Sequence, residues 1–180
     1  DGNEFSYSAE RGGIITSIKF HGKEILFLDE ETFYNPEVSV KGGIPILFPS
    51  IGPVESSLFP DMKQHGFARN ASNWVAEKFE NGFKETLMTD KEKFKSYPYN
   101  FKVYFEGKFE NNAFIINQKV ENLEDSKLLP ICTGLHPFFY VPLSEKKNVR
   151  FNFDGGKIIE EQFETWANGT YIVIDNPKVK

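Results

Sequence analysis

Short apolar runs recur along this sequence, and turn residues separate them at regular intervals. Two pairs of runs flank an Asn-Gly or Asn-Asn dipeptide: 73–80 with 83–89 around Asn81-Gly82, and 101–110 with 113–121 around Asn111-Asn112. Such dipeptides favour two-residue hairpins, because both central residues of the preferred turn take positive φ. The pattern therefore predicts two antiparallel hairpins and, with them, an all-β chain.

Other segments of the chain support the same fold class. Further strands are expected at residues 14–20, 24–28, 128–133, 135–141, 149–153 and 171–175, with a tight turn at 21–23. Residues 90–96 are the one helical candidate, and residues 160–166 are ambiguous. Closely spaced strands with polar turns favour a sandwich or barrel. The 19 Phe residues fit, since aromatic side chains pack well on pleated sheets.

Length and charge narrow the class of protein. The 180 residues suit one domain, 1–180, which buries one core. The formal charge of −5 argues against a nucleic-acid partner, and no apolar run nears the roughly 20 residues that span a bilayer. The N-terminus is polar and acidic, so we expect no signal peptide. A single cysteine excludes an internal disulfide, and we expect a cytoplasmic protein with no membrane partner.

Three segments do not fit a plain sandwich: KGGIPILFPSIGP (41–53), QHGFAR (64–69) and TGLHPFF (133–139). They are rich in Gly and Pro, which regular strands tolerate poorly, and they hold two of the three histidines. If 64–69 is extended, His65, Phe67 and Arg69 share one face, which suits a ligand with polar groups and apolar ring faces, such as a sugar. The alternative is an Arg in a surface salt bridge and a His bonded to a backbone carbonyl.

His136 has two interpretations of equal weight. The first is a general acid, because imidazole titrates near neutral pH. The second is a core histidine under an aromatic cluster. Cys132 lies too far along a strand to pair with it as a nucleophile, and we interpret Cys132 as a small buried residue. Lys41 precedes two glycines, which let a backbone approach a ligand, so its ammonium is a candidate for phosphate or a sugar hydroxyl. Three dispersed histidines disfavour a metal site.

Three segments, in their order along the chain, resemble the aldose 1-epimerase, or galactose mutarotase-like, superfamily. They are KGGIPILFPSIGP (41–53), HGFARNASNW (65–74) and TGLHPFFYVP (133–142). The similarity is greatest to its glucose-6-phosphate 1-epimerase branch, and residues 11–28 resemble the first hairpin of the family. The resemblance implies a large antiparallel β-sandwich with a sugar cleft, and an enzyme that interconverts the α and β anomers of a hexose or hexose 6-phosphate without cofactor or metal.

The resemblance also implies roles for four residues. His136 matches the general acid of the family, His65 its second active-site histidine and Arg69 a substrate-binding arginine. Lys41 stands where the hexose-phosphate branch commonly has Arg, and a point charge binds phosphate differently from a guanidinium fork.

The catalytic base of the family is a Glu near the C-terminus, and no residue here matches its motif. We therefore expect a C-terminally incomplete chain, with the base beyond Lys180. A non-catalytic carbohydrate-binding relative and a β-sandwich interaction domain are the alternatives. The sequence does not specify an oligomeric state.

Overall fold

The computed structural model describes residues 2–54, 57, 59, 61–152, 157–159, 164–166 and 171–173. The chain divides into two compact units, Asp1–Tyr140 and Val141–Lys180. All four candidate site residues belong to the first unit, and the expectation of a single domain over 1–180 stays a prediction. Within the described ranges, no helix has the length and apolar character that crossing a bilayer requires.

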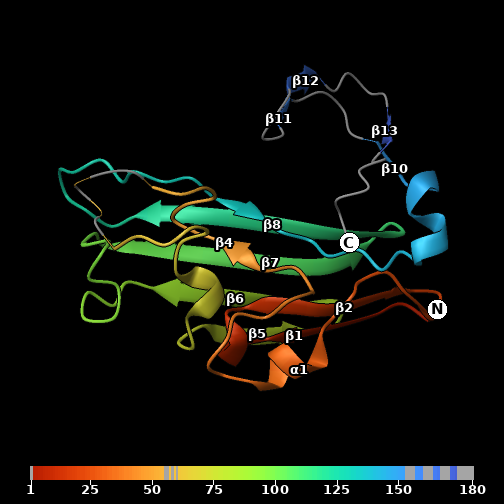
Figure 1. The fold of residues 1–180 in the computed structure, drawn as a ribbon. Coiled ribbons are helices and arrows are strands. Elements are labelled where there is room, and N and C mark those ends of the chain that lie inside the picture. Colours follow the sequence, from red (N-terminus) through yellow and green to blue (C-terminus); the bar gives the residue numbers. More distant parts are fainter. Residues whose placement is uncertain are drawn as a thin grey trace. The chain divides into compact units, whose positions relative to one another are not determined.

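The first unit contains a four-stranded antiparallel sheet in the order β5-β6-β7-β8, drawn as long neighbouring strands in Figure 1. Its strands are β5 Val75–Phe79, β6 Gly82–Met88, β7 Phe101–Glu110 and β8 Ala113–Asn122. Both predicted hairpins are confirmed. Asn111 and Asn112 take φ of 49° and 60°, as the two-residue turn requires.

The first of these hairpins turns one residue earlier than its Asn-Gly pair predicts. Phe79 pairs with Gly82, so Glu80 and Asn81 form the loop and Gly82 opens β6. A Cβ added to Gly82 would lie 2.5 Å from the carbonyl oxygen of Gly107. The glycine therefore serves the close approach of β6 to β7 and not the turn.

A second sheet has the order β1-β2-β3, from Glu4–Ser8, Ile14–Phe20 and Lys23–Glu24. The expected strand 14–20 is confirmed, whereas the expected strand 24–28 continues only as isolated bridges at Leu26 and Leu28. A five-residue helix, α1 (Glu30–Tyr34), follows; its N-cap Asp29 accepts hydrogen bonds from two backbone amides. The sequence analysis did not predict this helix.

Several other expectations are wrong. Residues 90–96 form turns and no helix, with the Phe94 amide bonded to the Asp90 carbonyl at 2.8 Å. Residues 128–133 form no strand, and 135–141 contribute only the end of β9 (Gly134–Leu135) and one bridge at Phe139. Each stretch contains a proline, Pro130 and Pro137, which cannot donate a backbone hydrogen bond to a neighbouring strand.

The second unit begins with the 3-10 helix η3 (Leu143–Asn148) and holds two short strand pairs. They are β10 (Arg150–Asn152) with β13 (Tyr171–Val173), and β11 (Lys157–Ile159) with β12 (Glu164–Trp166). The expected strands 149–153 and 171–175 overlap β10 and β13. Residues 153, 160–163 and 174–175 of these expectations lie outside the described residues.

The core of the first unit is aromatic. Phe83, Phe101 and Phe105 are fully buried on one face of the long sheet, and Phe48 packs on Phe101 from another segment with ring centroids 5.0 Å apart. Each fully buried Phe contributes about 2–3 kcal/mol of transfer free energy. This cluster supports the backbone from which the candidate site residues project.

Candidate active site

One irregular segment, residues 43–49, lies between the two histidine-bearing segments. On one side β4 (Ile46–Leu47) pairs antiparallel with β9, and the His136 amide donates to the Pro45 carbonyl at 3.2 Å. On the other side Phe48 bridges to Gly66, and its carbonyl accepts from the amides of residues 67 and 68. The backbone thus brings the neighbourhoods of His65 and His136 together across 71 residues of sequence.

His65 occupies a tight turn in a conformation that is uncommon for its residue type. The Gly66 amide donates to the Lys63 carbonyl at 2.9 Å, and His65 takes φ +70° at the position where such turns favour glycine. Gly66 also has positive φ, and an added Cβ there would lie 2.1 Å from the Phe48 carbonyl oxygen. Backbone strain of this kind costs about 1–3 kcal/mol and concentrates at functional sites.

The protonation of the His65 ring follows from its hydrogen bond. Its Nδ1 lies 2.6 Å from the Ile51 carbonyl oxygen. A carbonyl can only accept, so Nδ1 carries the proton and donates it. Burial lowers the pKa of His65 below its ordinary value, and the charges of Arg69 and His136 lower it further against the opposing effect of the Ile51 bond. The neutral ring therefore presents an unprotonated Nε2.

The two imidazoles are neighbours. Their ring centroids lie 5.6 Å apart in an edge-to-face arrangement, and the His136 ring stacks on Phe138 at 4.8 Å. His136 is exposed, and His65 is partly buried. Among the described residues, none makes a hydrogen bond to the His136 ring nitrogens. Both rings are thus close enough to contact one small ligand, and the His136 ring is the more accessible of the two.

Arg69 lies in the 3-10 helix η2 (Ala68–Asn70). Its Nε is buried and has no hydrogen-bond partner, and burial lowers the pKa of its guanidinium. No salt bridge holds it in the part of the chain that the structure describes. A buried donor without a partner is costly, and an acceptor from a ligand would satisfy it.

Gly12 keeps Arg69 in place. A Cβ at Gly12 would fall 2.0 Å from the Arg69 carbonyl oxygen, and Gly12 has φ +84°. The Trp74 indole donates to the Ala68 carbonyl at 3.0 Å from the buried side. The backbone that carries the Arg69 side chain is therefore fixed by contacts on two sides.

Lys41 is held through its backbone by the segment that contains α1. Its amide donates to the Thr32 hydroxyl at 3.0 Å, and its carbonyl accepts from the Asp29 amide at 2.9 Å, while its side chain is exposed. Among the described residues, no contact joins it to either imidazole. The following glycines approach the protein's own backbone, since a Cβ at Gly42 would lie 2.6 Å from Leu28, and not a ligand site.

Three details differ from the sequence-based expectation. The segment 64–69 is not extended, because η2 replaces the strand, and Phe67 stacks on Phe94 in the core at 4.0 Å instead of lining the site. Cys132 is exposed, not buried.

Among the described residues, no group of three or more His, Cys, Asp or Glu could hold a metal ion.

Two contributors to the site were missed in the sequence. The Ile51 carbonyl orients His65, and Phe138 supports His136. The dense Gly and Pro content of residues 41–53 was a signal that this backbone serves a site, but it could not reveal which carbonyl faces an imidazole.

Several known proteins are similar in sequence to this chain. The sequence model of the aldose 1-epimerase family matches residues 7–171. The plasmid-encoded LacX protein of Lactococcus lactis is 30% identical over 146 residues, which are 74% of this chain and 47% of LacX. A putative glucose-6-phosphate 1-epimerase of Cenchrus ciliaris is 42% identical over 60 residues, which are 33% of this chain and 17% of that protein. The chain thus spans less than half the length of these relatives.

The fold is also found in solved structures. Slr1438 from Synechocystis superposes with a TM-score of 0.76 at 28% identity, over 96% of this chain and 60% of that one. A galactose mutarotase related enzyme of Lactobacillus acidophilus superposes with a TM-score of 0.72 at 23% identity, over 96% of this chain and 62% of that one. These likenesses, with the antiparallel sheets described above, confirm the expected all-β, mutarotase-like β-sandwich fold. Because the family match extends over most of the sequence, the chain belongs to the aldose 1-epimerase family.

Proposed function

We propose that the protein containing this chain interconverts the α and β anomers of a hexose or hexose 6-phosphate by acid–base ring opening. The observation that carries the proposal is the pair of imidazoles 5.6 Å apart, one of which has a defined tautomer. Mutarotation requires an acid that protonates the ring oxygen and a base that removes the proton from the C1 hydroxyl. Opening, rotation about the C1–C2 bond and closure on the other face then give the other anomer.

His136 and His65 divide the work of the pair in this proposal. Because burial lowers the pKa of His65, its neutral form is favoured, and its role is to accept a hydrogen bond and not to act as the acid. His136 then acts as the general acid on the ring oxygen. The free Nε2 of His65 accepts a hydrogen bond from a sugar hydroxyl, and this bond holds the sugar ring next to His136. We assign the base to none of the described residues.

Arg69 and Lys41 contact the substrate in different ways. The unpartnered Nε of Arg69 donates to a sugar oxygen, which satisfies a buried polar group on binding. Lys41 is exposed and contacts a peripheral hydroxyl or the 6-phosphate as a point charge. We further propose a cytoplasmic enzyme that uses no cofactor.

The test is anomer exchange of glucose and glucose 6-phosphate by exchange NMR in the full natural chain. His136→Ala should lower the exchange rate by about 10²–10⁴-fold and leave sugar affinity within about threefold, since a positioned acid contributes that much to rate. Wild-type exchange in this variant would refute the acid role. Saturable sugar binding without exchange in the unsubstituted protein would instead support a non-catalytic carbohydrate-binding relative.

A further inference from the structure

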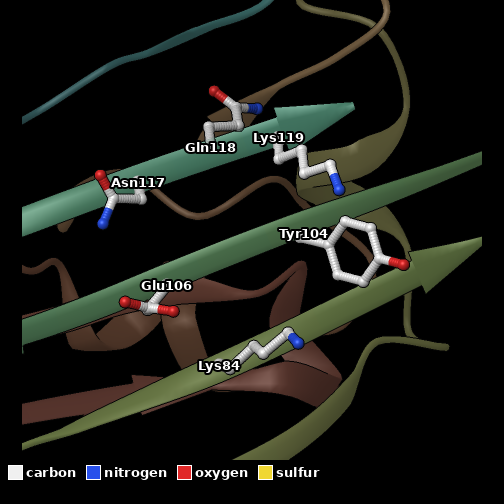
Figure 2. Close-up of a pocket in the computed structure, with 6 residues that line it drawn as sticks. All are labelled: Lys84, Tyr104, Glu106, Asn117, Gln118 and Lys119. Carbon is white, nitrogen blue, oxygen red and sulfur yellow. The ribbon is translucent and has the colours of Figure 1, made fainter. Parts of the chain in front are cut away.

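A second candidate site lies on the outer face of the long sheet. Side chains alternate along β6 and β7, so Phe83 and Phe105 enter the core while Lys84 and Tyr104 point the other way. Here the structure has a hollow of about 380 Å³, shown in Figure 2 and lined by Lys84, Tyr104, Glu106, Asn117, Gln118 and Lys119. A volume of this size suits a small molecule.

Three lysines surround the Tyr104 ring, and two of them, Lys84 and Lys119, also line the hollow. The ammonium groups of Lys84, Lys102 and Lys119 lie 5.0, 5.2 and 5.3 Å from the centroid of the Tyr104 ring. They come from three adjacent strands, β6, β7 and β8, and Figure 2 shows those of Lys84 and Lys119 directed toward the ring. The Tyr104 hydroxyl donates to Glu121 at 2.9 Å, which fixes the ring between them.

Two carboxylates, Glu106 and Glu121, lie opposite Lys84 and Lys102 in the strand register and offset part of this positive charge. Among the described residues, none of the three lysines forms a salt bridge. Glu121 accepts the Tyr104 hydroxyl, and Glu106 lines the hollow without an ion pair to Lys84. The cation–π contacts attract each ammonium to the ring, while the like charges repel one another. A compact anion with more than one charge would relieve this repulsion.

We propose that the hollow binds the phosphate group of a small phosphorylated polyol, with Lys84, Lys102 and Lys119 around a phosphate monoester. A monoester carries close to two negative charges at neutral pH and three acceptor oxygens, one for each ammonium. Asn117 and Glu106 line the same hollow and can hydrogen-bond hydroxyl groups of the ligand. The Glu106 carboxylate and the net charge of −5 disfavour a continuous polyanion such as nucleic acid.

This site is independent of the imidazole pair and does not rest on the proposed function. The inner face of the same sheet packs against Phe48, whose segment carries the histidine neighbourhoods. The core therefore lies between the two places. A ligand that is not an aldose should bind here without entering the imidazole site.

The test is a ¹H–¹⁵N NMR titration of the full natural chain with glycerol 3-phosphate at low ionic strength, and with glycerol as the uncharged control. We expect saturable shifts of Lys84, Tyr104 and Lys119 with phosphate-bearing ligand only. The triple variant K84Q/K102Q/K119Q should weaken binding about tenfold or more, since each exposed ion pair contributes about two- to threefold. Vesicles of phosphatidic acid in phosphatidylcholine should not sediment the protein.

The matched control is K63Q/K95Q/K127Q, which removes the same charge at three exposed lysines outside the hollow. It should bind within about twofold of the unsubstituted protein, and so should His136→Ala. The proposal is overturned by absent saturation, by equal weakening in the control triple variant, by loss of binding in His136→Ala, or by binding to the vesicles alone.

Discussion

Glu85 should make the stability of this fold fall as the pH rises. It lies on β6 between Phe83 and Leu87 and is fully buried, and among the described residues neither of its carboxylate oxygens has a hydrogen-bond partner. Its nearest environment includes Gly13, where an added Cβ would lie 2.9 Å from Oε2 and 3.0 Å from the Trp74 ring. Burial raises the pKa of Glu85 from its ordinary value of 4.5 to about 8.

The sign follows from proton binding in the two states. Between pH 4.5 and about 8 the unfolded chain loses the Glu85 proton and the folded chain keeps it. The folded state is therefore favoured fully below pH 4.5, and this contribution is lost as the pH rises through 8. Each pH unit in this window costs about 1.4 kcal/mol, so the loss is about 3 kcal/mol by pH 7 and about 5 kcal/mol above pH 9. Domains are stable by only about 5–15 kcal/mol in total.

Urea unfolding, followed by tryptophan fluorescence from pH 4.5 to 9, measures this effect. Glu85→Gln keeps the shape of the side chain and removes the charge, so the difference in unfolding free energy between it and the unsubstituted protein should grow by about 3 kcal/mol from pH 4.5 to 7. Glu77→Gln, at an exposed position on β5, is the control and should leave the pH profile unchanged. A pH-independent difference for Glu85→Gln would refute the reasoning.

Three further variants test the site. His65→Asn should lower the rate of anomer exchange at least tenfold. Its unfolding free energy in urea should stay within about 1 kcal/mol of that of the unsubstituted protein, because Asn tolerates positive φ. Unchanged exchange would remove His65 from the mechanism. Gly12→Ala should lower the unfolding free energy by about 2 kcal/mol or more and weaken sugar binding in a fluorescence titration, because its Cβ meets the Arg69 backbone; unchanged values would contradict this packing. Lys41→Ala should weaken the binding of glucose 6-phosphate more than the binding of glucose, as measured by calorimetry. Equal losses of affinity for the two sugars would remove the phosphate contact.

The strands that local signals define were predictable. Residues 14–20 and 101–110 form strands with the expected bounds, because alternating apolar residues and turn chemistry both lie within a few residues of them. The strand expected at 128–133 fails for the opposite reason. Its backbone instead bonds singly to residues that only the folded chain brings near, as when the Cys132 amide donates to the Pro49 carbonyl, while Leu128 is exposed.

The candidate site was predictable in its residue types and not in its geometry. His65 and His136 were identified from their Gly- and Pro-rich surroundings and from the resemblance. Their spacing in the sequence could not show that the backbone of residues 43–49 would bring them together. The burial of Glu85 was not predicted, although the residue shares the period-two pattern of Phe83 and Leu87. Such a pattern places the carboxylate in the core, but only coordinates reveal that nothing there bonds to it.

The most direct test of the account is the protonation of the two imidazoles, measured by long-range ¹H–¹⁵N NMR of the full natural chain with and without glucose. We predict that His65 is neutral near pH 7, with its proton on Nδ1 and a bare Nε2, and that glucose shifts the nitrogen resonances of both His65 and His136. A His65 ring with its proton on Nε2, or a response to glucose in neither ring or only one, would contradict the claim that the pair forms one sugar site.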